Sequence, residues 1–304
     1  MVQKDSLMKE KLLIISGPTG VGKTDISLKI AKKFNGEIIS CDSMQIYKGF
    51  DIGTAKIKEE EKNGIVHHMI DVVEPDSSYS VYEYKTKVQE LITNLNKKNK
   101  MPIMVGGTGL YIDSVLYDYD FKKADKNQKL RDYMQHLAQK YGNQFLCLEL
   151  DKVNIDYSKI AFNDTRRLIR LLEADKKDGN ETKKSKYDFL HISLKMDRST
   201  LYERINKRVD LMFNSGLQEE VENLLKQGIG FDSQPMQSIG YKEFKEYFDG
   251  VISFDELKEK IKQNSRHYAK RQLTWFNNSD NIVNYDLSLG ADNIYKIIGE
   301  WYKK

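Results

Sequence analysis

The sequence predicts an α/β protein with a parallel sheet core, helices on both faces, a helical insertion and a helical C-terminal part. Short apolar runs alternate with helix-period segments at first, whereas nearly everything after Asp197 is helical in period. Strands that alternate with helices at this spacing favour a parallel sheet, because crossover helices join parallel strands. We therefore expect residues 1–117 and 188–304 to form the core with its C-terminal extension. Residues 118–187, which are charged and mostly helical in period, are the expected insertion.

Five short apolar runs are the predicted strands. The first is followed by a helix-period segment at residues 23–34, so the chain begins as strand, loop and helix. Residues 80–96 carry apolar side chains three and four positions apart, which predicts an amphipathic helix. Turns are expected at residues 228–235, at Gly250 and at residues 277–281. The predicted strands are residues 12–16, 37–40, 66–72, 101–105 and 189–196.

The composition is that of an ordinary globular protein. Of 304 residues, 39% are hydrophobic and 31% charged, and the net charge of +4 is too small to indicate nucleic acid by itself. No stretch reaches the roughly 18 uncharged apolar residues that cross a bilayer, and the N-terminus carries no secretory signal. Cys41 and Cys147 form neither a disulfide framework nor a metal spacing. We expect a cytoplasmic monomer with no membrane contact and no obligate protein partner.

A phosphate-binding pattern follows the first predicted strand. Residues 17–24 fit G-x-x-x-x-G-K-[ST] between a strand and a helix, as that pattern requires. The glycines let successive N–H groups point at phosphate oxygens, and the helix N-terminus adds a favourable partial charge. Lys23 supplies a cation and Thr24 a hydroxyl ligand for Mg²⁺, so the core is predicted to be P-loop NTPase-like. The loop residues are Gly17, Pro18, Thr19, Gly20, Val21, Gly22, Lys23 and Thr24.

Two further segments lie at the ends of predicted strands. Ligands of open α/β sheets bind at the carboxyl ends of the strands, so Asp42 is placed to face whatever the loop holds. In a kinase such a carboxylate binds Mg²⁺ or takes a proton from a hydroxyl, and the alternative is that Asp42 caps the following turn. The glycines of residues 106–111 permit close backbone approach to a ligand.

Basic residues gather in two stretches. Basic clusters on separate helices can follow a phosphate backbone, and solvated helix faces are the alternative. The first stretch comprises Arg166, Arg167, Arg170, Lys176, Lys177, Lys183, Lys184 and Lys186, and the second comprises Lys258, Lys260, Lys262, Arg266, Lys270 and Arg271.

The phosphate loop is one of seven segments that occur together in one enzyme family. The block DSMQIYKGFDIGTAK at residues 42–56 is the most specific of them. On these segments the sequence from about residue 12 to residue 276 resembles the tRNA dimethylallyltransferases, also called tRNA isopentenyltransferases. It lacks the Cys/His zinc segment of the eukaryotic members and so resembles the bacterial type. The segments are residues 17–24, 42–56, 67–71, 106–111, 163–167, 237–243 and 269–276.

The resemblance implies an alkyl transfer. A dimethylallyl group would pass from dimethylallyl diphosphate to the N6 amine of an adenosine beside the tRNA anticodon, with release of diphosphate. The loop would hold the diphosphate together with Mg²⁺ on Thr24, and either Arg204 or Arg208 would reach it. Asp42 would accept the amine proton. The implied catalytic residues are Asp42, Thr19, Lys23 and Arg208.

The resemblance also implies contacts with the anticodon stem-loop of tRNA. The reactive base must approach Asp42, so the segment that follows it is expected to read the base. Arg166 and Arg170 share one helix face and suit phosphate contacts. The sequence leaves the roles of His67, His68, Lys270 and Arg271 open, and Trp275 either stacks on a base or packs in the core. The expected tRNA contacts are Asp42, Ser43, Met44, Gln45, Thr108, Arg131, Arg166, Arg167 and Arg170.

Other functions remain open on the residues alone. One is a small-molecule kinase that uses Asp42 as base, and another is a non-catalytic nucleotide switch or tRNA-binding factor. A third is an adenylate isopentenyltransferase, which acts on free nucleotide and should lack the helical insertion. The helices beyond the core and the two basic stretches argue against a metabolite kinase, which needs neither.

Overall fold

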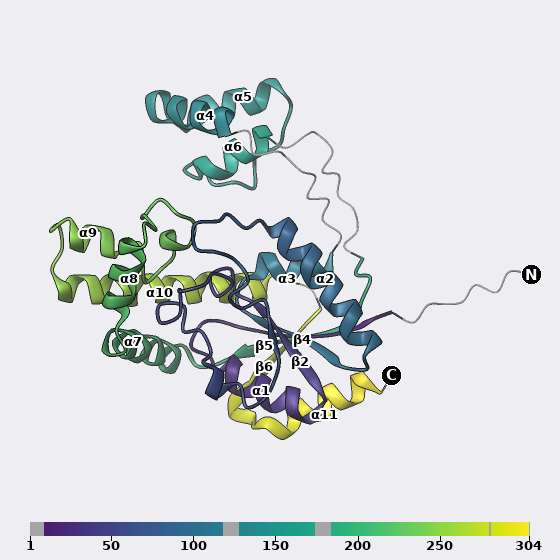
Figure 1. Cartoon of the computed structure of the whole chain (residues 1–304). Coiled ribbons are helices and arrows are strands. Elements are labelled where there is room, and N and C mark those ends of the chain that lie inside the picture. Colours follow the sequence, from purple (N-terminus) through teal and green to yellow (C-terminus); the bar gives the residue numbers. More distant parts are fainter. Residues whose placement is uncertain (1–8, 118–127, 174–183, 280, 304) are drawn as a thin grey trace, which may run out of the picture. The chain divides into compact units, whose positions relative to one another are not determined.

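The computed structural model describes residues 9–117, 128–173, 184–279 and 281–303 (Figure 1). The chain forms two compact units, of which the second runs from Asp118 to Lys184 and the first comprises the rest. The second unit stops short of residue 187 because Ser185 pairs with Tyr117 in an antiparallel bridge of the first unit. Parts of the predicted insertion and basic stretch lie outside the described residues, namely residues 118–127, Lys176, Lys177 and Lys183.

The described part of the first unit contains a six-stranded sheet in the order β3-β2-β4-β1-β5-β6. Every neighbouring pair is parallel, which confirms the predicted fold class. In β1 all side chains from Leu12 to Ser16 are buried, as expected of a central strand with helices on both faces. The strands are β1 (Lys11–Ser16), β2 (Gly36–Cys41), β3 (His67–His68), β4 (Met101–Gly106), β5 (Asp188–Lys195) and β6 (Ile282–Asp286).

Two strands differ from the prediction. The strand predicted at residues 66–72 is only the two-residue β3, because Met69 and Asp71 adopt φ of 62° and 55° and turn the chain out of the sheet. The strand β6 was missed because an edge strand exposes most of its side chains, and in β6 only Tyr285 is buried. His68 lies in β3 with its Nε2 2.7 Å from a carboxylate oxygen of Glu37, a contact that holds this edge of the sheet.

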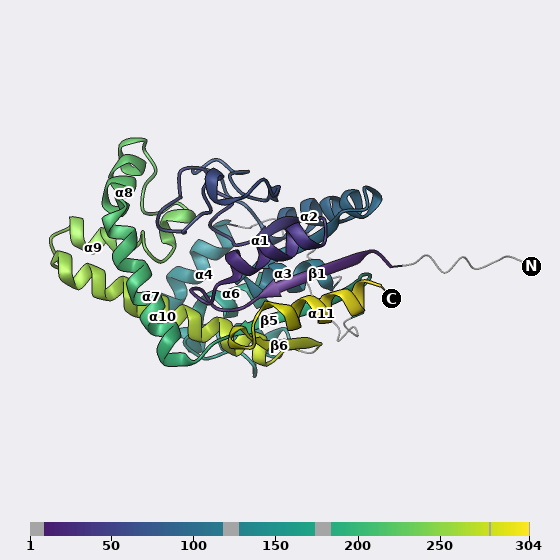
Figure 2. The ribbon, with the colours of Figure 1, turned by 90° about the horizontal axis from the view of Figure 1, so that it is seen from below.

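Helices cover both faces of the sheet (Figures 1 and 2). On one face lie α1 (Lys23–Lys33) and α11 (Ala291–Tyr302), and on the other lie α2 (Val81–Lys97) and α3 (Gly109–Leu116). Ser80 caps α2, since its hydroxyl accepts a hydrogen bond from the N–H group three residues on. The predicted helices at residues 23–34 and 80–96 are thus present, each within a residue or so of the expected ends.

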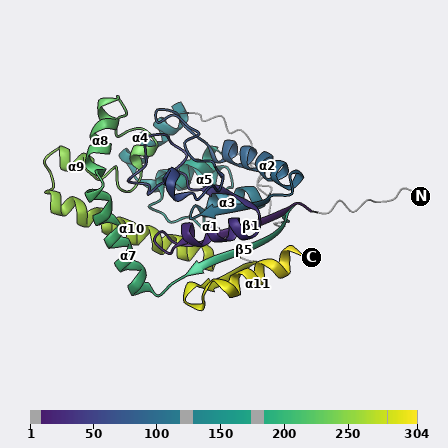
Figure 3. The same cartoon turned by 60° about the horizontal axis from the view of Figure 1, so that its bottom comes forward.

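The remaining helices of the first unit gather beyond the end of the sheet to which β5 points (Figure 3). The segment after β2 folds onto them, and Phe50 packs against Tyr241 with ring centroids 4.8 Å apart. The strands of a parallel sheet have their carboxyl ends at the same edge, which is where ligands bind. These helices cover that edge. They are α7 (Arg198–Asn214), α8 (Leu217–Lys226), α9 (Phe244–Phe248) and α10 (Phe254–Asn277), with the short 3₁₀ turns η1 (Glu59–Glu61), η2 (Pro235–Gln237) and η3 (Leu287–Leu289) elsewhere in the unit.

The second unit is helical where it is described. It consists of α4 (Gln128–Tyr141), α5 (Asn143–Lys152) and α6 (Thr165–Glu173), which enclose a small apolar core around Leu146 and Leu168. Among the described residues of the whole chain, no helix is both long enough and apolar enough to cross a membrane.

Candidate active site

The loop between β1 and α1 turns at three glycines. Gly17, Gly20 and Gly22 have φ of 143°, 82° and 101°, which side chains rarely adopt. A Cβ on Gly17 would also lie 2.8 Å from the carbonyl oxygen of Leu194. Gly22 is the N-cap of α1 and has no side chain to cap it, so the N–H groups of the first turn stay available to an anion.

Lys23 folds back across this loop. Its Nζ donates hydrogen bonds to the carbonyl oxygens of Gly17, at 2.9 Å, and Pro18, at 2.8 Å. Burial, and after it the charge of Arg208, lower the pKa of Lys23 to about 7 against the opposing attraction of Asp42. An amine held in this way becomes charged more readily when an anion enters, because the anion favours the protonated form.

Asp42 follows β2 directly and has two roles. Its Oδ1 accepts hydrogen bonds from the N–H groups of Met44, at 2.9 Å, and Gln45, at 3.4 Å, so it caps the turn as the alternative interpretation held. The same side chain lines a cavity beside the phosphate loop, together with Thr19 and Arg208. The roles are compatible, because the turn binds Oδ1 and the second carboxylate oxygen can face a ligand.

Of the three arginines on α7, Arg208 is the one that donates a hydrogen bond to the loop. Its Nη1 donates to the hydroxyl of Thr19 at 2.9 Å, and its Nη2 donates to the carbonyl oxygen of Thr54 at 3.4 Å. Burial lowers the pKa of the guanidinium, which marks it as a partly desolvated cation. Arg204 lies one turn earlier and is exposed, with Nη1 3.8 Å from the sulfur of Met196, and its Nη2 would lie 3.8 Å from a Cβ on Gly22 of the loop.

The cavity has a volume of about 320 Å³ and joins polar and apolar surfaces. Its polar side chains include Thr19, Asp42 and Arg208, and Ser43 and Met44 also line it. A ligand with a charged phosphate part and a hydrocarbon part therefore finds matching surfaces in one space. The apolar wall is formed by Ile205, Val209, Met212, Ile239 and Ile261.

Gln272 on α10 connects the loop to the rest of the site, and sequence reasoning did not single it out. Its Oε1 accepts a hydrogen bond from the N–H of Thr19 at 2.8 Å, and its Nε2 donates to the carbonyl oxygen of Gly107 at 3.0 Å. The amide is 5% exposed. Its position within the matched segment 269–276 was the available signal, although nothing local distinguished it from its neighbours.

The glycines after β4 make room for protein side chains. A Cβ on Gly107 would lie 2.0 Å from Nε2 of Gln272, and one on Gly109 would lie 2.3 Å from Nε1 of Trp275. The space at these glycines is thus filled by side chains of α10, and the predicted approach of a ligand to residues 106–111 stays a prediction. Thr108 lies between the two glycines as the N-cap of α3 and is half-buried.

The predicted phosphate contacts of the second unit fall into two groups. Arg166, Arg167 and Arg170 are exposed on α6. Arg131 is instead held by both carboxylate oxygens of Glu173, at 2.5 and 2.8 Å, and that carboxylate is 6% exposed. This ion pair ties α4 to α6, so Arg131 holds the unit together while the arginines of α6 face solvent.

In the second basic stretch, too, some side chains make contacts within the protein while others face the cavity or solvent. Lys262 lies 2.9 Å from a carboxylate oxygen of Asp210, an ion pair between α10 and α7. Arg271 lines the cavity, with its guanidinium 5.6 Å from the centre of the Tyr268 ring. Lys270 is exposed and does not line the cavity. Only part of this stretch is therefore available to a ligand in the cavity.

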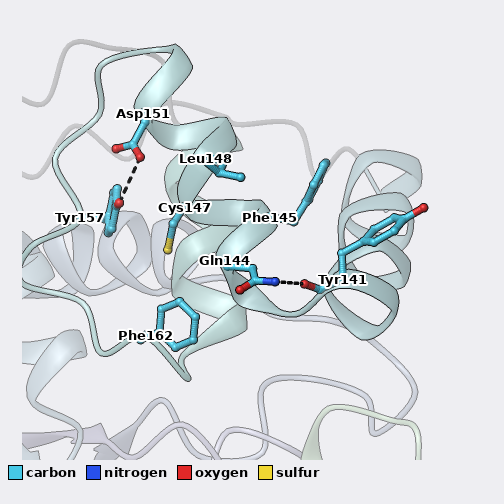
Figure 4. A pocket seen from close by; sticks show the side chains of 8 residues that line it. All are labelled: Tyr141, Gln144, Phe145, Cys147, Leu148, Asp151, Tyr157 and Phe162. Atoms are coloured by element: carbon cyan, nitrogen blue, oxygen red, sulfur yellow. Dashed lines mark hydrogen bonds between the residues drawn. The ribbon is translucent and has the colours of Figure 1, made fainter.

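A larger hollow of about 580 Å³ lies within the second unit (Figure 4). Its single carboxylate, that of Asp151, accepts a hydrogen bond from the hydroxyl of Tyr157 at 3.3 Å. No lysine or arginine is among its described lining residues, so nothing there neutralises a phosphate. The lining residues are Tyr141, Gln144, Phe145, Cys147, Leu148, Asp151, Tyr157 and Phe162.

Thr24 is the residue of the phosphate loop that would offer a hydroxyl ligand to Mg²⁺. Thr24 is exposed in the first turn of α1. Within the described ranges, no three His, Cys, Asp or Glu side chains come together as a metal site. Mg²⁺ usually keeps several waters and binds substrate phosphates, so the other ligands of an ion at Thr24 would come from these sources.

Fold and site together define an α/β protein whose phosphate loop opens into a partly apolar cavity. The family described as "IPP transferase" matches residues 45–279 of the sequence. This range exceeds half of the chain, and it contains all the matched segments that follow the phosphate loop except the first residues of the block at 42–56. The chain belongs to the IPP transferase family.

Individual relatives agree with this assignment. The tRNA dimethylallyltransferase of Bacillus subtilis is 46% identical over 293 residues, with 93% of both chains covered, and that of Bacillus cytotoxicus is 47% identical over 291 residues, covering 93% of this chain and 92% of the relative. The crystal structure of the full-length tRNA isopentenylpyrophosphate transferase of Bacillus halodurans matches with a TM-score of 0.76 and 41% identity, covering 97% of each chain. A eukaryotic dimethylallyltransferase acting on tRNA matches with a TM-score of 0.79 and 28% identity over 95% of this chain and 77% of that one.

Proposed function

We propose that this protein transfers a dimethylallyl group from dimethylallyl diphosphate to the N6 amine of an adenosine beside the anticodon of tRNA. The observation that carries the proposal is the single cavity that joins the phosphate loop, the carboxylate of Asp42 and an apolar wall. A phosphate donor such as ATP leaves the apolar wall without a partner, whereas a prenyl diphosphate uses both parts.

The leaving diphosphate is stabilised by charge that is already in place. As the allylic C–O bond breaks, negative charge grows on the departing oxygens. Lys23, Arg208 and the N–H groups at the start of α1 lie at the loop and attract that charge. Mg²⁺ held at Thr24 would supply further positive charge to the diphosphate. The apolar wall holds the dimethylallyl group and keeps water from the allylic carbon.

Asp42 completes the reaction as general base. The N6 amine attacks the allylic carbon, so that a C–N bond forms, the C–O bond breaks, and the amine proton passes to the carboxylate. The N–H groups of Met44 and Gln45 bind Oδ1 and hold the side chain, which leaves the second oxygen to accept the proton. Proton acceptance of this kind contributes about 10²–10⁴-fold.

Each unit has features that suit the tRNA partner. The anticodon stem-loop presents phosphates, which suit the exposed Arg166 and Arg170 of α6, and a base that must leave its stack to reach Asp42. Ser43 and Met44 line the cavity where that base would enter. We propose that the protein acts as a monomer. Its two free, buried cysteines suit the reducing cytoplasm, where we place the reaction.

Labelled dimethylallyl diphosphate tests the activity. The protein is incubated with it, Mg²⁺ and either unmodified tRNA or AMP, and label is expected on tRNA. Label on AMP and none on tRNA would contradict the proposal, as would transfer of the γ-phosphate of ATP to a hydroxyl acceptor.

A matched pair of variants tests the site. Arg208→Ala should lower turnover by about 10²–10³-fold, because it removes a donor to the leaving group. Lys207→Ala removes the same charge from the preceding residue of α7 and should leave turnover near normal, since Lys207 is exposed and does not line the cavity. Equal losses in both variants would contradict the assignment.

A further inference from the structure

The carboxylate of Glu220, in the first turn of α8, binds a stretch of backbone. Its Oε2 accepts hydrogen bonds from the N–H groups of Asp51 and Ile52, at 3.0 and 2.7 Å. Its Oε1 accepts one from the N–H of Gly53 at 3.2 Å and one from the hydroxyl of Tyr241 at 2.6 Å. Hydrogen bonds to a charged acceptor are about twice as strong as neutral ones, so four of them fix where this segment lies.

The segment held in this way is a wall of the cavity. Gly53 and Thr54 both line it. The carbonyl oxygen of Thr54 accepts hydrogen bonds from Nη2 of Arg208, at 3.4 Å, and from Nε2 of Gln45, at 3.2 Å. Nη1 of the same guanidinium donates to the hydroxyl of Thr19 at 2.9 Å. A continuous chain of contacts therefore leads from the carboxylate on α8 to the phosphate loop.

Tyr241 also contacts the segment. A Cβ on Gly53 would lie 2.5 Å from Cε2 of the Tyr241 ring, so backbone and ring are in direct contact. Tyr241 is fully buried, and burial raises the pKa of its hydroxyl well above the ordinary value. The hydroxyl therefore stays protonated and donates to Glu220. Because the ring and the carboxylate both contact Gly53 and also each other, they fix the position of the segment.

We infer that Glu220 is a positioning residue for the reaction and acts through Arg208, an inference that rests on the proposed function. Glu220 does not line the cavity and touches no reacting group. It fixes residues 51–54, and the carbonyl oxygen of Thr54 is one of the two anchors of the guanidinium. Since Arg208 stabilises charge that grows on the leaving group, loss of its anchor lowers kcat more than it changes the KM for tRNA.

The experiment compares two neighbouring carboxylates on α8. Glu220→Gln should lower kcat about 10- to 100-fold, the effect expected when a catalytic group is displaced by about 1 Å. Its KM for tRNA should stay within about twofold, because the exposed arginines of α6 are unchanged. Glu219→Gln removes the same charge from an exposed side chain in the same turn and should behave like the wild-type protein. Equal kinetics in the two variants would overturn the inference.

A double-mutant cycle shows whether Glu220 acts through the guanidinium. In an Arg208→Ala background, Glu220→Gln should lower kcat by less than about threefold, because the contact that it supports is already gone. A loss as large as in the wild-type background overturns the inference. Tyr241→Phe keeps the ring and removes one of the four hydrogen-bond donors to Glu220, so it should give a smaller loss of kcat. If Glu220→Gln does not fold, Tyr241→Phe can replace it in the comparison of the two backgrounds.

Binding of inorganic diphosphate, measured by calorimetry, separates this inference from the proposed function. If the wild-type protein transfers no label to tRNA, the proposed function fails. Glu220→Gln should still weaken diphosphate binding in the wild-type background and have little effect in the Arg208→Ala background. Equal weakening in both backgrounds overturns the positioning role by itself.

Discussion

Binding of dimethylallyl diphosphate should be coupled to proton uptake by Lys23. Burial and the charge of Arg208 lower the pKa of this amine to about 7 in the free protein. At pH 8 a group with that pKa is about ten-elevenths deprotonated. The bound diphosphate favours the charged amine and raises its pKa, so about 0.9 proton should be taken up per site at pH 8. Lys23 is protonated in the complex but mostly deprotonated in the free protein above pH 7. The affinity for dimethylallyl diphosphate should therefore fall as the pH rises above 7, by up to about tenfold per pH unit, until the pH reaches the pKa of Lys23 in the complex.

Calorimetry in buffers with different ionisation enthalpies measures this uptake directly, without tRNA, so that no transfer occurs. The control is Lys23→Arg, which keeps the positive charge throughout this pH range and should show almost none of the uptake. Taking the difference between the two proteins removes the titration of the diphosphate itself. If Lys23→Arg takes up as many protons as the wild-type protein at pH 8, Lys23 is not the titrating group and the electrostatic reasoning about the loop is refuted.

Three further predictions concern the general base Asp42, the arginines of α6 that are proposed to contact tRNA, and the packing of α10. Asp42→Ala should lower turnover by two to four orders of magnitude while tRNA affinity changes less, and near-normal turnover in a single-turnover assay would remove Asp42 from the mechanism. Replacing Arg166 and Arg170 together by Ala should reduce the slope of log Kobs against log salt for tRNA by about 1.5, and an unchanged slope would mean that α6 does not contact the RNA. Gly109→Ala should lower the free energy of unfolding by about 1–3 kcal/mol, since its Cβ would meet the Trp275 indole at 2.3 Å. Gly299→Ala in α11 is the control and should be neutral or slightly stabilising, because no atom lies within 4 Å of its Cβ; equal denaturation midpoints for the two variants would contradict the packing argument.

The buried strands were predictable, whereas the edge strand β3 was predicted too long and the edge strand β6 was missed. The central strands β1, β2, β4 and β5 are apolar runs because both of their faces are covered, and a continuous apolar run is easy to recognise. At the two edges of the sheet this apolar pattern is weaker. In β6 only Tyr285 is buried, and β3 consists of two histidines before the chain turns away at Met69. Local sequence cannot reveal pairing that depends on a neighbour such as β5.

Part of the candidate site was likewise predictable from the sequence, and part was not. The phosphate loop was predictable because its chemistry requires glycines and a lysine at fixed spacing within one segment. The different contacts of Arg204 and Arg208 were not, because both lie on one helix and only the packing of α7 places Arg208 against Thr19 and Arg204 beside Gly22. The two interpretations of Asp42 were treated as alternatives, although a carboxylate has two oxygens and can serve in both roles.

The matched segments combine side chains that face a ligand with side chains that hold these in place. In the segment at residues 237–243, Ser238 and Gly240 line the cavity, whereas Tyr241 and Glu243 are buried behind it. The carboxylate of Glu243 accepts a hydrogen bond from the N–H of Gly240 at 2.9 Å and fixes that part of the wall. Gln272 does the same for the phosphate loop. A cavity built from segments far apart in the chain keeps its geometry only if each segment is anchored, so buried polar residues of this kind belong to the site although they touch no substrate.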